Sequence, residues 1–221
     1  MNREVVAIID FGSQYCQLIA RRVREQNVFS QIFPAGVDVE QLKKVNLKGL
    51  ILSGGPASVY VDGAPVCDER IFELGVPVLG ICYGMQLGCR HFGGDVKPAE
   101  KREYGRTNLC IGDSSDLFFN ISGGTTAWAS HGDQLENPGG DFEVLATTDS
   151  CPYAAVRYRE KKFYGVQFHP EVSHTPKGQQ MIENFLYRIC GCSGDWKMGD
   201  FVAENVEAIR RQVGDDRVIC G

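Results

Sequence analysis

Three apolar runs in the first part of the chain are continuous rather than alternating. They cover residues 5–9, 49–52 and 76–81, and each stops at a polar or glycine-rich segment. The first is followed by apolar residues at helical spacing over residues 18–23. Continuous apolar strands separated by helical segments are typical of a parallel sheet that is covered on both faces. We therefore predict a doubly wound α/β fold, with functional groups at the carboxyl ends of the strands.

The apolar segments become shorter from about residue 107 onward. Candidate strands lie at residues 125–128, 142–146, 154–158 and 163–168, separated by turn formers. They predict a mostly antiparallel extension of the same sheet. Residues 178–189 then carry apolar side chains at the spacing of one buried helical face, and this helix is expected to close a first domain over residues 1–192.

Residues 193–221 form a separate pattern at the end of the chain. An amphipathic helix is predicted after Trp196, with apolar side chains from Phe201 to Val213. Residues 217–221 then resemble a new apolar strand that stops abruptly. We expect a linker helix followed by the first strand of a second, truncated domain.

Composition and charge limit the classes of function. The 221 residues are 43% hydrophobic and 23% charged, as in soluble globular proteins. The net charge of −5 argues against a nucleic-acid partner, and no apolar run is long enough for a membrane span. Nine cysteines at irregular spacing fit free, mostly buried thiols in a reducing compartment, so we expect the cytoplasm.

A candidate nucleophile lies where the third apolar run meets a helix-compatible segment. Gly80-Ile81-Cys82-Tyr83-Gly84 has the form G-x-C-x-G, the context of a nucleophile elbow. A thiol at a helix N-terminus faces free N–H groups, which favour the thiolate. The alternative is a structural cysteine between two packing glycines. The strand, turn and helix context favours the nucleophile.

A candidate base follows the last predicted strand of the first domain. His169 and Glu171 flank Pro170, and residues i and i+2 of an extended segment share a face. His169 could reach Cys82 while Glu171 orients the imidazole. An exposed histidine beside a solvated glutamate is the alternative. The order Cys, His, Glu differs from the order in α/β-hydrolases.

Ser53-Gly54-Gly55-Pro56 follows the second apolar run, next to the predicted position of Cys82. The amides of Gly55 and Tyr83 are candidates for an oxyanion hole, since a glycine pair can turn an N–H into a cavity. The segment lacks the lysine of a phosphate-binding loop. Read alone, it could be a plain turn.

These three motifs together resemble the class I (triad type) glutamine amidotransferases. Further segments at residues 9–15, 102–105, 130–133, 174–175 and 189–192 are similar to members in which this domain precedes an ATP-pyrophosphatase (synthetase) domain. The resemblance spans essentially the whole chain and implies a flavodoxin-like fold. Cys16 and Ala129 depart from residues that are more frequent in the family, but neither is a triad position.

The resemblance implies a role for each matching residue. Cys82 would be the nucleophile, His169 the general base and acid, and Glu171 its orienting partner, with the oxyanion held by Gly55 and Tyr83. The glutamine-binding residues that it implies are Gly54, Gln86, Ser130, His131, Gly132 and Asp133.

The implied reaction converts glutamine to glutamate and ammonia through a γ-glutamyl thioester on Cys82. The resemblance implies no cofactor or metal in this domain, whereas the synthetase domain would use ATP and Mg²⁺ to aminate a nucleotide. The full-length enzyme is expected to be a homodimer, and this chain to end just before the catalytic loop of the synthetase. Alternatives are a stand-alone γ-glutamyl hydrolase or peptidase of the same fold and a catalytically silent interaction module.

Several further polar residues are left with open roles. Arg102 and Glu103 are read either as a surface ion pair or as a contact with the synthetase half. His174 has no assigned role, and His91 is expected to cover a helix end. Cys190 and Cys192 are predicted to be structural thiols, because no second pair of ligands lies nearby in the sequence.

Overall fold

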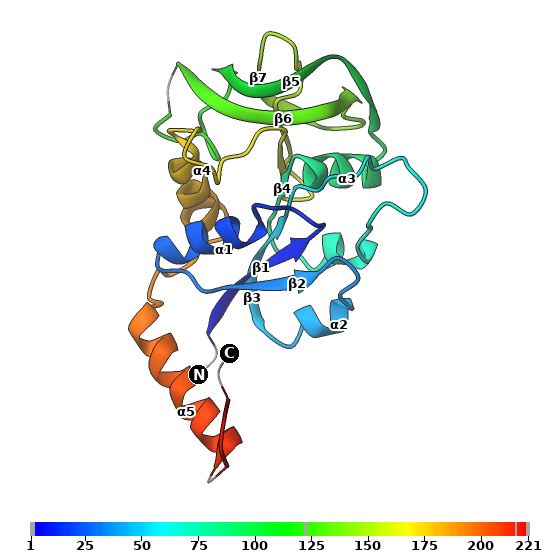
Figure 1. Cartoon of the computed structure of the whole chain (residues 1–221). Helices are drawn as coiled ribbons and strands as arrows, with labels where there is room; N and C mark the ends of the chain where they lie inside the picture. Colours follow the sequence, from blue (N-terminus) through cyan, green and yellow to red (C-terminus); the bar gives the residue numbers. More distant parts are fainter. Residues whose placement is uncertain (1–2, 122, 215, 220–221) are drawn as a thin grey trace.

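The fold is built on one large mixed sheet (Figure 1), seen in a computed structural model that describes residues 3–121, 123–214 and 216–219. Within these residues the sheet has nine strands in the order β2-β1-β3-β4-β9-β8-β7-β5-β6. The first five strands in this order are parallel to one another, and the remaining pairings are antiparallel. The predicted α/β class with an antiparallel extension is therefore confirmed.

A hydrophobic core lies on each face of the parallel half of the sheet. Its strands are β1 (Glu4–Asp10), β2 (Ser30–Pro34), β3 (Asn46–Leu52), β4 (Val78–Ile81) and β9 (Phe163–Val166). Alternate side chains of β1 point to opposite faces: Val6 and Ile8 pack in the cluster that contains Ile19 of α1 (Cys16–Glu25), whereas Ala7 and Ile9 belong to the cluster that contains Met85 of α3 (Tyr83–His91). Burial on both faces explains why the runs are continuously apolar.

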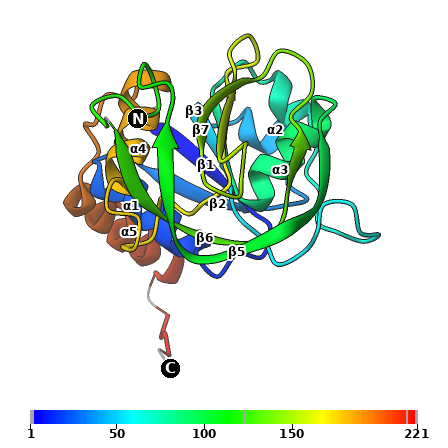
Figure 2. The ribbon, with the colours of Figure 1, turned by 90° about the horizontal axis from the view of Figure 1, so that it is seen from above.

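The antiparallel half differs in detail from its prediction. It consists of β5 (Asp95–Ile111), β6 (Gly124–Asn137), β7 (Glu143–Thr147) and β8 (Ala155–Tyr158). Strand β5 and the second half of β6 were not predicted, because most of β5 is exposed and shows no apolar alternation. These two strands curve together over one side of the molecule (Figure 2). Strand β9, predicted within the extension, joins the two halves by pairing parallel to β4 and antiparallel to β8.

The remaining short elements connect the strands or pack against the sheet. The predicted helix over residues 178–189 forms as α4 (Gly178–Asn184) and a final π-helical turn (Phe185–Ile189), with its apolar face buried. A short helix α2 (Val39–Leu42) and a 3₁₀ turn (Glu69–Glu73) connect strands on the other face. Strand β2 and both of these elements were not predicted, because their apolar residues show no clear periodicity in the sequence.

The C-terminal segment forms the predicted helix but not the predicted strand. Helix α5 (Met198–Val213) extends away from the sheet (Figure 1), and its Val202, Val206 and Ile209 side chains are exposed. Residues 217–219 form no strand, because no strand of the described chain lies beside them to pair with; residues 220–221 lie outside the described part. No helix in the described ranges combines the length and apolar character that a bilayer crossing needs.

Candidate active site

Cys82 occupies a strained turn between β4 and α3. Its φ of 50° lies in the left-handed region, which is costly for a side chain other than glycine. The Cys82 amide donates to Val166 O at 2.7 Å, which fixes the turn against β9. A Cβ atom on Gly80 would lie 2.6 Å from the Gly84 backbone, so only glycine permits this close approach. The turn predicted from G-x-C-x-G is therefore present.

His169 and Glu171 lie on the turn that follows β9, next to Cys82. His169 Nδ1 is 2.8 Å from Glu171 Oε1, and both side chains are buried, with exposed fractions of 5% and 0% for the two residues. The turn is held by the Thr175 hydroxyl, which donates to His169 O at 2.6 Å, and by Arg22, which donates to Glu171 O at 2.9 Å. These bonds fix the backbone that carries the two side chains, and Glu171 orients the imidazole.

The electrostatics of this pair favour a protonated imidazole. Burial lowers the pKa of His169, but hydrogen bonds to Cys82 and to Glu171 outweigh burial and raise that pKa to about 10. Because Nδ1 faces Glu171, the other ring nitrogen is the one available to the sulfur. The Tyr15 ring meets the imidazole edge-on, with ring centroids 5.3 Å apart.

The glycine loop after β3 approaches the same place. A Cβ atom on Gly54 would lie 3.3 Å from His169 Cε1 and 3.8 Å from Cys82 Cβ. One on Gly55 would lie 2.9 Å from Phe11 O, closer than packing allows. Gly55 and Tyr83, whose amides are the predicted oxyanion donors, both line the cavity that contains Cys82.

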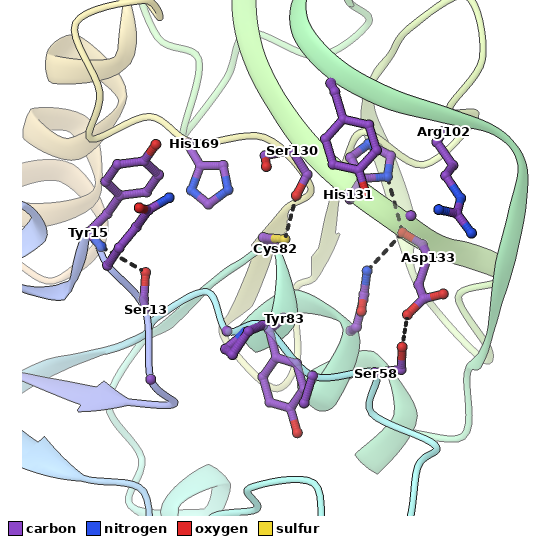
Figure 3. Close-up of a pocket in the computed structure, with 18 of the residues that line it drawn as sticks. Ser13, Tyr15, Ser58, Cys82, Tyr83, Arg102, Ser130, His131, Asp133 and His169 are labelled. Atoms are coloured by element: carbon purple, nitrogen blue, oxygen red, sulfur yellow. Dashed lines mark hydrogen bonds between the residues drawn. The ribbon is translucent and has the colours of Figure 1, made fainter.

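The cavity has a volume of about 690 Å³ and collects most of the predicted residues. Figure 3 shows Cys82 at its centre, with His169 and Tyr15 on one side and Arg102, His131 and Asp133 on the other. Every residue predicted to hold glutamine borders this cavity except Gly54, which lies close to His169 and Cys82. Glu171 lies behind His169. The sequence motifs therefore converge on one site.

The wall opposite His169 is built around Asp133. Its carboxylate accepts hydrogen bonds from the hydroxyls of Ser58 and Tyr60, the latter at 2.8 Å. Its backbone oxygen accepts from Gln86 Nε2 at 3.0 Å. Sequence reasoning missed Ser58 and Tyr60, because they belong to an irregular loop without periodicity or motif.

A second histidine–glutamate pair belongs to that wall, with His131 bordering the cavity and Glu103 behind it. His131 Nε2 is 3.1 Å from Glu103 Oε2, and the hydroxyls of Thr148 and Ser150 each donate to the other Glu103 oxygen at 2.6 Å. Burial lowers the pKa of His131, and Glu103 only partly offsets this effect. Glu103 is buried, so the surface ion pair with Arg102 considered from the sequence is wrong; Arg102 instead borders the cavity.

The other open residues have packing roles. His174 lies against Trp128 with ring centroids 4.6 Å apart, and His91 ends α3 stacked on Phe72 at 4.5 Å. All eight cysteines of the described chain are free, including Cys190 and Cys192. Across the described residues, no group of three or more histidine, cysteine, aspartate or glutamate side chains could hold a metal ion.

Comparisons with known sequences agree with this geometry. The family model described as "Glutamine amidotransferase class-I" matches residues 7–189. The chain is 53% identical to the "GMP synthase [glutamine-hydrolyzing]" of Acetivibrio thermocellus and 52% identical to that of Ruminiclostridium cellulolyticum, each over 220 residues. All of this chain is covered in both matches, but it spans only 43% of the length of either relative.

Solved structures give the same result for the fold. A putative GMP synthase subunit from Thermoplasma acidophilum superposes with a TM-score of 0.78 at 28% identity, covering 94% of this chain and 99% of that one. A glutamine amidotransferase from Thermotoga maritima superposes with a TM-score of 0.68 at 18% identity, covering 86% and 99%, and supports the fold alone. On the family match and the identity to these relatives, the chain belongs to the class-I glutamine amidotransferases.

Proposed function

We propose that this chain hydrolyses glutamine to glutamate and ammonia, with Cys82 as nucleophile, His169 as general acid and base, and Glu171 as the partner of His169. The observation that carries the proposal is the buried His169–Glu171 pair, with its 2.8 Å contact, beside a cysteine held on a strained strand-to-helix turn. A thiolate next to an imidazolium is the arrangement that acyl transfer through a thioester needs.

The first half of the reaction forms the thioester. The Cys82 sulfur attacks the side-chain amide carbon of glutamine, and the amides of Gly55 and Tyr83 hold the negative oxygen. His169 gives its proton to the amide nitrogen, the C–N bond breaks, and ammonia leaves. In the second half, His169 takes a proton from water, the resulting hydroxide attacks the thioester carbon, and glutamate leaves as the Cys82 sulfur is released.

Glutamine would occupy the cavity between the two walls. Gly54 lies close to His169 and Cys82, and the cavity is bordered by Gln86, Ser130, His131, Gly132 and Asp133. The carboxylate of Asp133 offers a negative charge for an α-ammonium group. The guanidinium of Arg102 offers a positive charge for an α-carboxylate on the same side. These charges suit a free amino acid better than a neutral amide.

The relatives' names extend the proposal to a second reaction. Both are called glutamine-hydrolysing GMP synthase and are more than twice the length of this chain. We propose that ammonia from this site passes to a synthetase (ATP-pyrophosphatase) domain, which uses ATP and Mg²⁺ to aminate xanthosine monophosphate to GMP. The full-length enzyme would act as a homodimer in the cytoplasm.

The direct test is the production of ammonia and glutamate from glutamine. The wild-type chain should release both in equal amounts, and Cys82→Ala should release neither while keeping its circular dichroism spectrum. Cys110→Ala is the matched control, because Cys110 is exposed and distant in sequence from every catalytic motif. Equal ammonia release by wild type and Cys82→Ala would overturn the proposed function.

A further inference from the structure

A buried amide side chain, Gln167, lies directly beside the proposed nucleophile. It follows the last residue of β9 and is only 1% exposed. Its backbone amide donates to Ala154 O at 2.8 Å, which anchors the residue to the strand end of β8. The catalytic steps above give it no role, although it is closer in sequence to His169 than any other buried polar residue except Glu171.

Gln167 connects the sulfur to the glutamine-binding wall. Its Nε2 donates to Cys82 Sγ at 3.6 Å, within the range for hydrogen bonds to sulfur. Its Oε1 accepts from Gln86 Nε2 at 3.1 Å, and the same Gln86 nitrogen donates to Asp133 O at 3.0 Å. A continuous series of hydrogen bonds therefore runs from Cys82 through two amides to Asp133.

The chemistry of an amide fixes the direction of this series. Because Asp133 O can only accept, it requires the NH₂ group of Gln86 to face it. The second hydrogen of that NH₂ group is directed to Gln167 Oε1, which turns the NH₂ group of Gln167 toward the sulfur. Gln86, which borders the cavity, is left with its carbonyl oxygen to meet a ligand.

The donor from Gln167 differs from the one that His169 supplies. Among the described residues, the charged and titratable side chains that line the cavity with Cys82 are those of His169, with Glu171 behind it, and of Arg102, His131, Asp133, Tyr15, Tyr60, Tyr83 and Tyr104. An imidazolium loses its stabilising charge when it passes its proton to the leaving group. A neutral amide N–H stays in place throughout the cycle and at every pH. Since the thiol itself donates to Ser130 O at 3.9 Å, the sulfur has a place both for its own proton and for this donor.

We propose that Gln167 is a positioning residue of the site: it donates an N–H to the Cys82 sulfur, favouring the thiolate, and it locks the amide of Gln86 so that a carbonyl oxygen faces the substrate. The first part concerns Cys82 alone. The second part rests on the proposed glutaminase function.

The first part is tested by the pH dependence of Cys82 alkylation with iodoacetamide, followed by peptide mass spectrometry on the intact 221-residue chain. Thiolate, not thiol, reacts, so the rate reports how readily the proton leaves. Gln167→Leu should move the midpoint of the Cys82 profile upward by about one pH unit. Gln167→Glu, which has the same shape but places a negative charge beside the sulfur, should move it further.

Exposed Cys110 provides an internal reference in every sample, and its profile should not change. Gln134→Leu is the matched control: Gln134 is a half-buried glutamine next to Asp133 in β6 that does not line the cavity. Unchanged Cys82 midpoints in both Gln167 variants would overturn the first part. So would a downward shift in Gln167→Leu, because it would mean that the Gln167 oxygen faces the sulfur.

The second part is tested by steady-state kinetics with glutamine. Gln167→Leu should raise KM for glutamine at least about fivefold and also lower kcat, whereas Gln134→Leu should change neither. An unchanged KM would overturn the second part. Alkylation requires no glutamine, so a chain without glutaminase activity would contradict the proposed function while leaving the Cys82 profiles to decide the role of Gln167.

Discussion

Two buried histidine–glutamate pairs flank the cavity, and their environments shift the two histidines in opposite directions. His169 lies 2.8 Å from Glu171, and its pKa is raised to about 10. His131 lies 3.1 Å from Glu103, and its pKa is lowered. The two pairs have the same chemical groups at similar distances. The other groups around each pair therefore determine the direction in which the histidine pKa is shifted.

The two carboxylates are engaged differently. Glu103 also accepts hydrogen bonds from the hydroxyls of Thr148 and Ser150, so part of its charge is already stabilised by other donors. The carboxylate of Glu171 bonds to His169, and Cys82 is a second partner that stabilises the imidazolium. We infer that the His169 pair transfers protons, whereas the neutral His131 gives its single N–H to Glu103 and forms part of the wall beside Asp133. The same type of residue pair is thus expected to transfer protons on one side of the cavity and to have a structural role on the other.

Replacing each histidine in turn should give the largest contrast. His169→Gln should lower kcat by about a thousandfold, since it removes the proposed general acid and base. His131→Gln should act mainly on KM and lower kcat by less than about tenfold, because this side chain only supports the binding wall. Steady-state assays of ammonia release measure both. Similar losses of kcat in the two variants would remove the distinction between the pairs.

The carboxylate of the second pair should matter for stability. Glu103→Gln places an amide where three donors need an acceptor, and it should lower the free energy of unfolding by about 2 kcal/mol. Urea denaturation measures this change. Lys101→Gln, which alters an exposed neighbour on β5, serves as the control and should change stability by less than about 0.5 kcal/mol. A stability of Glu103→Gln equal to wild type would show that the buried network contributes nothing.

The lowered pKa of His131 should make stability depend on pH below neutrality. An unfolded histidine takes up a proton near pH 6.5, whereas folded His131 resists it, so this stability is present above about pH 6.5 and is lost as pH falls. His169 behaves oppositely: its contribution is present below about pH 6.5 and is lost as pH rises through about 10.

Urea denaturation between about pH 8 and about pH 5.5 tests this assignment. His131→Gln should flatten the acidic loss of stability by at most about 1.4 kcal/mol for each pH unit, and His169→Gln should not flatten it. A steeper acidic loss in His131→Gln than in wild type would mean that folded His131 takes up its proton readily.

The smallest effect should come from a single hydroxyl around Glu103. Ser150→Ala removes one donor from the carboxylate, so Glu103 should attract the His131 proton more strongly and raise its pKa. Titration of the histidine ring signals by NMR measures this shift. His169 should titrate as in wild type. A shift confined to His169 would show that the two pairs are coupled across the cavity rather than separate.

The side of the cavity with Cys82 and His169 could be predicted from the sequence far better than the side with His131 and Glu103. Cys82 and His169 each follow an apolar strand at a glycine or proline turn, so short local patterns place both residues at the same sheet edge. Glu103 lies on a long, mostly exposed strand without apolar alternation, and its partners Thr148 and Ser150 are more than forty residues away. Pairing over that distance depends on the register of β5 with its neighbours, which no local pattern contains.

The same reasoning explains Gln167 and the end of the chain. Gln167 lies just before the His169 motif, but its value as a donor appears only when β9 lies beside β4 and brings it to Cys82. The apolar pattern of residues 217–221 predicted a strand, yet a strand needs a neighbour, and the described chain offers none there. Local pattern predicts what a segment can form, and tertiary contacts decide whether it does.

The central claim, that Cys82 is the nucleophile that attacks glutamine, is tested most directly by labelling with an electrophilic glutamine analogue and locating the adduct by peptide mass spectrometry. The structure predicts one adduct, on Cys82, which excess glutamine slows and His169→Gln suppresses. Labelling of exposed Cys110 at the same rate, or labelling of Cys82 that glutamine does not slow, would contradict it.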